Sequence, residues 1–252
     1  MTDFYARSLK IVERGNISML REQYDNEVDE LSKIVPIEVV REGDSDLYSE
    51  GKFIVLANHI ATPSIYPITD KKLTDRFGLE VEGHHWKILS PLIFRHFPFI
   101  KFLRSIGHEG HIISKSSNDD VLNTIRSGWG LCVIPNSQTA RTLMLQDYVK
   151  NLPGNHSIVV FPESGDSHWY LDQYHWLLPF RKGAYYISRE NDLPILPISI
   201  AYDEEECVYY LYVHEMERPD KDLDLGEVVE YMHYLEDKIA TGIRTVQKRF
   251  RD

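Results

Sequence analysis

The feature that most constrains the fold is a pair of apolar runs, residues 52–57 and 157–161, each followed at once by polar residues. Continuous runs of this length, without alternation of polar and apolar residues, are typical of strands that are buried on both faces. The first run leads into Asn58 and His59, and the second leads into a turn that carries Glu163. The sequence therefore predicts a buried sheet with polar side chains where two of its strands end.

The rest of the chain alternates between helical and strand patterns. Residues 3–34 have apolar positions at helical spacing with a break at Gly15–Asn16, which predicts a helical hairpin or a kinked helix. Further strands are expected at residues 36–40, 131–134, 194–200 (with prolines at its edge) and 208–213, and further helices at residues 118–127, 139–150, 181–190 and 226–251. This order predicts an α/β fold whose mixed, mainly parallel sheet is covered by helices. We expect an N-terminal helical segment at 1–35 and one α/β domain at 36–252.

Two strand ends carry residues suited to chemistry. Ligands of such sheets gather at the carboxyl ends of the strands, where His59 and Glu163 are both expected. A histidine has a pKa near neutrality, which suits a general base. A single histidine at a strand end is more often structural. The second strand end, with Glu163 on a tight Pro/Gly turn, is what favours a functional site.

Composition and cysteine usage exclude several classes of protein. The 252-residue chain has 28 basic and 39 acidic residues, and the formal net charge of −11 argues against a nucleic-acid-binding protein. The two cysteines, Cys132 and Cys207, lie in apolar runs and are expected to be buried thiols, which excludes a disulfide framework. The histidines match no established zinc spacing, and we expect no metal.

The hydropathy pattern bears on membrane association. No uninterrupted apolar stretch reaches about 18 residues, and the N-terminus lacks the pattern of a signal peptide. We expect a cytoplasmic protein that is at most peripheral to a membrane. The apolar segment 90–106 is either a packed helix pair or a partly exposed, membrane-facing surface. The basic tail at 244–251 is either a solvated helix face or a contact for anionic lipid.

Five short motifs, in order, resemble those of the glycerolipid acyltransferases, the family typified by 1-acylglycerol-3-phosphate acyltransferase. The family motifs are Asn-His-x4-Asp, a strand ending in arginine, Phe-Pro-Glu-Gly-Thr-Arg-Ser, Pro-Phe-Lys-Lys-Gly-Ala and Pro-Ile-x-Pro-Val. Their counterparts here are Asn58-His59, Val133 to Asn136, Phe161 to Ser167, Pro179 to Ala184 and Pro194 to Ile198. The resemblance covers roughly residues 50 to 200. Each motif alone is weak, and the ordered set carries the resemblance.

The resemblance implies an acyl transfer without a covalent enzyme intermediate. His59 would take a proton from a hydroxyl or amine acceptor, which then attacks the thioester of acyl-CoA or an acyl carrier protein. No other cofactor is implied, and the expected partners are this donor and a small-molecule or lipid acceptor. Backbone N–H groups at the turns would stabilise the oxyanion. The implied substrate-binding residues are Asn58, Asn136, Ser164, Gly165, Arg181 and Lys182. The stretch from Leu92 to Leu103 either lines an acyl-chain channel or belongs to the core.

The chain departs from the family pattern at residues that matter for the acceptor. Ser64 stands where the family has the aspartate partner of its histidine, and a serine can orient the ring but brings no charge. Asp166 replaces the arginine of the third motif. The arginine of the second motif becomes Asn136, or Lys115 in an alternative alignment at 112–115. Because guanidinium groups suit phosphate and Asp166 would repel it, we expect the acceptor not to be a simple glycerol phosphate.

Three functions follow from these residues. The enzyme could act on a neutral or cationic acceptor, with Asp166 or Glu163 supplying negative charge near His59 or binding an acceptor amine. The site could instead be degenerate, with the fold serving lipid or acyl binding. A serine hydrolase or thioesterase using Ser164 or Ser167 is the third, although the Gly-x-Ser-x-Gly elbow is missing.

Overall fold

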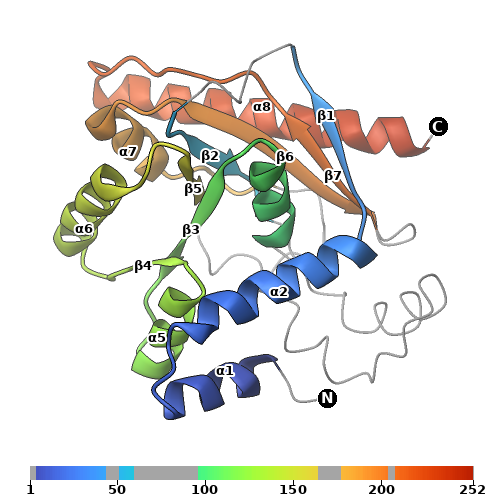
Figure 1. Ribbon diagram of the computed structural model, residues 1–252. Coiled ribbons are helices and arrows are strands. Elements are labelled where there is room, and N and C mark those ends of the chain that lie inside the picture. The colour runs from blue at the N-terminus through green and yellow to red at the C-terminus, as the bar shows by residue number, and fades with distance from the viewer. Residues whose placement is uncertain (1–3, 44–50, 60–95, 164–176, 204–207, 252) are drawn as a thin grey trace.

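The structure is a computed structural model that describes residues 4–43, 51–59, 96–163, 177–203 and 208–251. Within these residues seven strands form one sheet in the order β1-β7-β6-β2-β5-β3-β4 (Figure 1). All neighbours are parallel except β6 and β7, which are antiparallel. The strands are β1 (Ile37–Arg41), β2 (Ile54–Ala57), β3 (Glu109–Lys115), β4 (Cys132–Ile134), β5 (His156–Val160), β6 (Ile195–Asp203) and β7 (Val208–Val213). The predicted mixed, mainly parallel α/β sheet is confirmed.

Helices cover both faces of this sheet. The helices are α1 (Phe4–Glu13), α2 (Met19–Ile34), a helix at 96–105, α5 (Asp120–Gly128), α6 (Gln138–Asn151), α7 (Gly183–Asn191) and α8 (Leu225–Arg251). The break predicted near residue 15 separates α1 from α2, where Gly15 has a φ of 72°, a conformation that glycine adopts without strain. In Figure 1 the long helix α8 runs along β6 and β7, whereas α2 lies on the opposite side of the sheet.

Alternate side chains of β2 explain why its run is apolar throughout. Val55 and Ala57 belong to a core cluster with residues of α2 and the helix at 96–105. Ile54 and Leu56 belong to a second cluster with residues of α6, α7 and α8. Because helices bury both faces of this central strand, no position along it tolerates a polar side chain.

The order of the strands positions the two predicted strand ends next to each other. β2 lies between β6 and β5, and Leu56 is the partner of Val160 in the parallel β2–β5 register. His59 and Glu163 each lie three residues beyond this pair. They therefore emerge at the same edge of the sheet, as expected.

One strand, β3, is a structural feature that the patterns did not predict. Its polar residues and glycine obscure the alternation of exposed and buried side chains. Gly110 lies against the helix at 96–105, and a Cβ there would stand 2.8 Å from Cδ1 of Leu103 and 2.9 Å from Cδ1 of Ile100. Within the described part of the 90–106 segment, Phe97, Phe99, Phe102 and Leu103 are all buried in the core. The core alternative therefore holds for these residues.

The prolines of β6 lie in an interior strand of the sheet. Pro194 precedes the strand and its carbonyl accepts from the N–H of Ile54 at 2.9 Å. Pro197 lies within the strand, but the antiparallel ladder with β7 begins only at Ile198. A residue without an N–H is tolerated there because the ladder with β7 has not yet begun.

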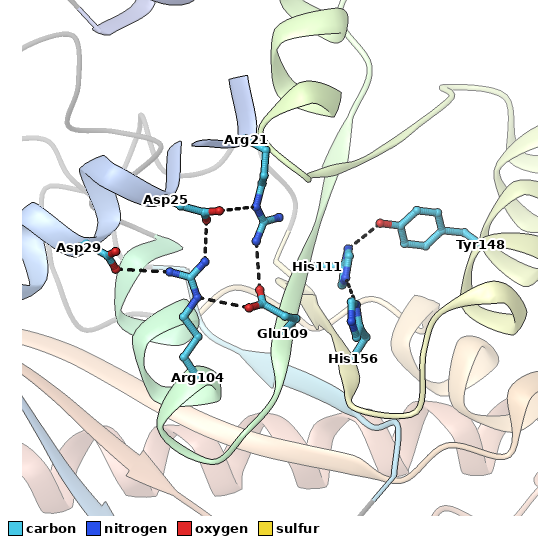
Figure 2. Close-up of polar contacts among 8 residues, drawn as sticks. All are labelled: Arg21, Asp25, Asp29, Arg104, Glu109, His111, Tyr148 and His156. Atoms are coloured by element: carbon cyan, nitrogen blue, oxygen red, sulfur yellow. Dashed lines mark hydrogen bonds and ion pairs between the residues drawn. The ribbon is translucent and has the colours of Figure 1, made fainter. Parts of the chain in front are cut away.

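An ion-pair network ties the N-terminal helix α2 to the sheet (Figure 2). Arg21 of α2 contacts Asp25 and Glu109, each at 3.0 Å. Arg104, from the helix at 96–105, contacts Asp25 at 2.6 Å and Glu109 at 3.6 Å. The network joins α2, the helix at 96–105 and β3 through alternating charges. All four side chains are partly exposed, so each pair contributes modestly to stability.

A helix that crosses a membrane must combine a length of about 20 residues with an apolar sequence. Among the residues that the structure describes, no helix combines the two.

Candidate active site

His59 and Glu163 make direct contact at the carboxyl edge of the sheet. The backbone N–H of His59 donates to Oε1 of Glu163 at 2.7 Å, and the N–H of Leu178 donates to Oε2 at 3.1 Å. Both carboxylate oxygens are therefore engaged by backbone, and the carboxylate joins the end of β2 to the segment that precedes α7. Glu163 fixes the backbone on which the imidazole of His59 is carried.

The environment of Glu163 opposes its ionisation. The side chain is only 8% exposed. Burial raises its pKa to about 7, and the charge of Glu236 adds to this effect, whereas the N–H groups of His59 and Leu178 oppose it. A buried carboxyl group that titrates near neutrality at a strand end is the kind of perturbed group that functional sites contain.

Asn58 continues the sheet beyond the last residue of β2. Its Nδ2 donates to the carbonyl of Ile200 at 2.9 Å, and its Oδ1 accepts from the N–H of Ile200 at 2.8 Å. The side-chain amide thus takes the place of a peptide group opposite β6 and is 5% exposed. Predicted as a substrate-binding residue, Asn58 is directed by these bonds at β6, where it fixes the start of the turn that carries His59.

The segment 177–182 lies beside Glu163 and carries the predicted Arg181 and Lys182. The N–H of Arg181 donates to the carbonyl of Pro162 at 3.1 Å, and the N–H of Phe180 donates to Oε2 of Glu236 at 3.1 Å. The side chain of Arg181 is exposed and that of Lys182 is half-buried. The backbone of this segment is thus held close to the candidate site while a cationic side chain reaches solvent.

Aromatic side chains surround Phe161 next to His59. The imidazole of His59 meets the ring of Phe161 edge-on, with ring centroids 4.8 Å apart. The imidazole of His96 stacks on the ring of Phe161, with centroids 6.1 Å apart. Phe99 packs against the same ring at 5.6 Å. Phe161 and His96 therefore belong to the surroundings of His59, and the sequence patterns gave His96 no signal.

The two candidates for the arginine of the resembled second motif lie at the ends of different strands. Asn136 follows β4, the outermost strand, where its side chain is exposed and its carbonyl accepts from Nη2 of Arg141 at 2.8 Å. Lys115 ends β3, which pairs directly with β5. Asn136 therefore lies at the edge of the sheet, two strands away from β5, which leads to Glu163. Lys115 lies on β3, the strand next to β5.

Five predicted site residues lie outside the described residues. They are Ser64, Ser164, Gly165, Asp166 and the alternative nucleophile Ser167.

A Ser-His-Glu arrangement elsewhere in the molecule has the connectivity of a hydrolase triad. Ser199 Oγ lies 2.9 Å from Nε2 of His214, whose Nδ1 lies 3.0 Å from Glu42. However, Ser199 is fully buried beneath α8, and its hydroxyl donates to the carbonyl of Ile239 at 2.7 Å. The hydroxyl is closed to substrate and its proton is already engaged, so the group docks a helix and supplies no nucleophile.

A histidine cluster between β3, β5 and α6 is also structural. His111 contacts His156 at 2.7 Å and the hydroxyl of Tyr148 at 2.7 Å (Figure 2). Burial lowers the pKa of His111 to about 4, and the charges of His156 and Arg21 add to this effect. Across the described ranges, no group of three or more His, Cys, Asp or Glu side chains has a metal-binding arrangement.

A surface cavity of about 600 Å³ lies at the opposite end of β2. It is lined by Lys52 and by residues of α6 and α7, including Lys150 and Glu190. Lys52 donates to the last carbonyls of α6, those of Val149 at 3.1 Å and Lys150 at 3.2 Å. The cavity lies where β2 begins and His59 lies beyond the end of β2, so the cavity is not part of the candidate site.

Comparisons with known proteins bear on the fold. No family model matches the sequence, and no curated protein matches it. Among solved structures, the chain is similar to the crystal structure of the 1-acyl-sn-glycerophosphate (LPA) acyltransferase PlsC from Thermotoga maritima. The TM-score is 0.53 at 20% sequence identity, and the match covers 97% of this chain and 93% of that one. Over nearly its whole length, this chain therefore shares the α/β fold of that acyltransferase.

Proposed function

We propose that this protein is an acyltransferase that moves an acyl group from a thioester, acyl-CoA or an acyl carrier protein, to a hydroxyl or amine acceptor. The observation that carries the proposal is the contact between the strand ends of β2 and β5, where Glu163 holds the backbone of His59 at 2.7 Å. These strand ends bear the Asn-His and Phe-Pro-Glu motifs within a fold shared with a solved LPA acyltransferase.

The chemistry assigns His59 the role of general base. A neutral imidazole takes the proton from the acceptor hydroxyl or amine as its oxygen or nitrogen attacks the thioester carbonyl carbon. The tetrahedral intermediate then collapses, the carbon–sulfur bond breaks, and the imidazolium returns the proton to the leaving thiolate. Glu163 acts through the backbone of His59 and Leu178, so we assign it a positioning role. Asn58 is likewise a positioning residue, through Ile200.

The acceptor follows from charge. Asp166 stands where the resembled motif has arginine, and a carboxylate there disfavours a phosphorylated acceptor. We therefore propose a neutral or cationic acceptor. Arg181, whose N–H bonds to the carbonyl of Pro162 next to Glu163, and the adjacent Lys182 are then available for the phosphates of the acyl donor.

A binding protein without catalysis is the second candidate. Both oxygens of Glu163 are engaged by backbone N–H groups, and Ser64 replaces the aspartate of the resembled motif. Neither the engaged oxygens of Glu163 nor the hydroxyl of Ser64 offers the imidazole the carboxylate of the resembled motif, the group that stabilises the imidazolium in triads. This candidate predicts acyl-thioester binding without thiol release.

The experiment that tests the proposal replaces His59 by alanine and by glutamine and measures thiol release from a long-chain acyl-CoA with an acceptor mixture. Removal of a general base costs about 10²- to 10⁴-fold in rate, and we expect a loss in this range with an unchanged unfolding temperature. His233, exposed on α8, supplies the matched control, because His233→Ala removes an imidazole away from the sheet edge. Equal rates for the His59 and His233 variants would make His59 structural.

A further inference from the structure

The backbone donors of the segment 177–182 are engaged one after another. The N–H of Leu178 donates to Glu163, that of Phe180 to Glu236, and that of Arg181 to the carbonyl of Pro162, each at 3.1 Å. Pro179, between the first two, has no N–H. Every backbone donor from 178 to 181 is thus fixed, by partners from two different parts of the chain.

Glu236 differs from the other two partners because it comes from α8. The residue lies one turn before Ile239, whose carbonyl accepts the buried hydroxyl of Ser199 at 2.7 Å. Close approach of the helix depends on Gly242, where a Cβ would stand 2.2 Å from Ser199 Oγ. The helix is therefore firmly seated on β6, and the carboxylate of Glu236 is presented from a rigid support.

The side chains of the segment divide between the core and solvent. Phe180 is buried in the cluster that α7 and α8 share, with 6% of its surface exposed, whereas Arg181 is exposed. The ring of Phe180 anchors the segment in this cluster, and the N–H of Phe180 anchors it to Glu236 of α8. Without the bond to Glu236, the segment would keep the buried ring of Phe180 and the backbone bonds of Leu178 to Glu163 and of Arg181 to Pro162.

We propose that Glu236 is a positioning residue of the acyl-transfer site. It holds the 177–182 segment in place, so that Glu163 keeps its hydrogen bonds to the N–H groups of both Leu178 and His59. The role rests on the proposed function, since the group being positioned is the base that we assign to acyl transfer. Glu236 acts through Phe180 and touches neither the reacting atoms nor the donor. Its charge also acts on Glu163, because it raises the pKa of that buried carboxyl.

Three substitutions separate the bond from the charge. Glu236→Gln keeps an oxygen that can accept from Phe180 and removes the charge. Glu236→Asp keeps the charge and shortens the reach, and Glu236→Ala removes both. Asp237→Ala is the matched control, an acidic residue exposed on the same helix. Glu236→Asp is conservative enough to fold if the alanine variant does not.

The first measurement is steady-state kinetics with long-chain acyl-CoA, with each variant's pH profile. Displacement of a positioned group by about 1 Å can cost 10²-fold, so we expect the alanine and aspartate variants to lose about 10- to 100-fold in kcat/KM. The glutamine variant should stay within about threefold. The limb of its pH profile that reports Glu163 should move to lower pH, because the charge of Glu236 that raises the pKa of Glu163 is gone. The control should match the wild type in both respects.

The second measurement needs no acyl transfer. Trypsin cleaves after Arg181 and Lys182 when the segment detaches, and we expect faster cleavage there in the alanine and aspartate variants, with wild-type rates for Glu236→Gln and Asp237→Ala. The sites are mapped by mass spectrometry of the fragments. Cleavage rates in the alanine and aspartate variants equal to the control's would overturn the positioning role. Accelerated cleavage with unchanged kcat/KM would overturn it as well.

The two measurements also separate this inference from the proposed function. If the wild-type protein transfers no acyl group, the proposed function fails, and the positioning role in that reaction fails with it, whereas trypsin still reports whether Glu236 holds the segment. If the wild type is active and neither Glu236→Ala nor Glu236→Asp changes kcat/KM, the proposed function stands and the role of Glu236 is wrong.

Discussion

The polar residues at the candidate site act mainly on backbone. Asn58 bonds to the N–H and carbonyl of Ile200, Glu163 to the N–H groups of His59 and Leu178, and Glu236 to the N–H of Phe180. Strand ends leave donors and acceptors without partners from the sheet, and these groups must be satisfied when they are buried. The side chains that satisfy them also determine where His59 is held.

Asn58 provides a direct test of this view. Asn58→Ala leaves the N–H and the carbonyl of Ile200, a residue that is 2% exposed, without these partners. Each buried group left unsatisfied costs about 1–3 kcal/mol, so for the two groups we expect a loss of about 2–6 kcal/mol in the free energy of unfolding. Urea titration measures it. The control is Asn151→Ala, which removes an exposed side chain that bonds to the carbonyl of Asp147, and should cost less than about 1 kcal/mol. Equal losses in the two variants would contradict the assignment.

Glu163 should make stability depend on pH. Its folded-state pKa of about 7 lies above the ordinary value of 4.5, so the folded protein binds a proton more strongly than the unfolded chain. The stability from this group is complete below pH 4.5 and is lost as the pH rises through about 7. Between pH 5 and pH 8, Glu163→Gln should therefore gain about 2–3 kcal/mol relative to the wild type, measured by urea unfolding at both pH values. A constant difference between the two proteins would show that Glu163 is not perturbed.

Residue pairs across long sequence separations mark the limit of prediction at this scale. His59 and Glu163 could be placed together because each follows a buried strand, and the ends of parallel strands share an edge. The bond between Asn58 and Ile200 spans 142 residues and leaves no pattern in the sequence. Glu236 gives no signal either, since one acidic residue on an amphipathic helix is ordinarily exposed.

At the scale of elements, apolar patterns predicted both terminal helical regions and six of the seven strands within the described residues. Each of these elements buries a clear stripe or a continuous run, which is the signal that sequence patterns carry. β3 was missed because Gly110 and His111 interrupt its pattern for reasons of packing. Gly110 makes room for a helix, and His111 bonds to His156 and Tyr148.

The seating of α8 can be tested at Gly242. Alanine favours helix by about 1 kcal/mol over glycine, so propensity alone predicts stabilisation by Gly242→Ala. A Cβ there would stand 2.2 Å from Ser199 Oγ and 2.7 Å from Nε2 of His214. Because overpacking costs about 1–3 kcal/mol, we expect Gly242→Ala to destabilise the protein and lower its unfolding temperature. Gly183→Ala, at the start of α7 with open space around it, should be neutral or stabilising. A rise in the unfolding temperature for both variants would contradict the close packing.

At the scale of the whole molecule, the strand order brings the motifs together. β2 lies between β6 and β5. β2 leads to His59, β5 leads to Glu163, and β6 contains Ile200, whose backbone holds Asn58. Helices on both faces leave the carboxyl edge of the sheet as the place where these residues emerge. A solved LPA acyltransferase has the same α/β fold, but a shared fold determines neither the reaction nor the acceptor.

The central claim is that acyl groups leave a thioester and arrive on an acceptor. The most direct measurement incubates the wild-type protein with radiolabelled long-chain acyl-CoA and separate phosphorylated, neutral and cationic acceptors, and quantifies released thiol, acylated acceptor and free fatty acid in the same tube. We expect released thiol and acylated acceptor in equal amounts, with a neutral or cationic acceptor preferred over glycerol 3-phosphate and lysophosphatidate. Free acid in place of acylated acceptor, with an acyl-serine adduct by intact mass, would indicate a hydrolase. No thiol release with any acceptor would contradict the account.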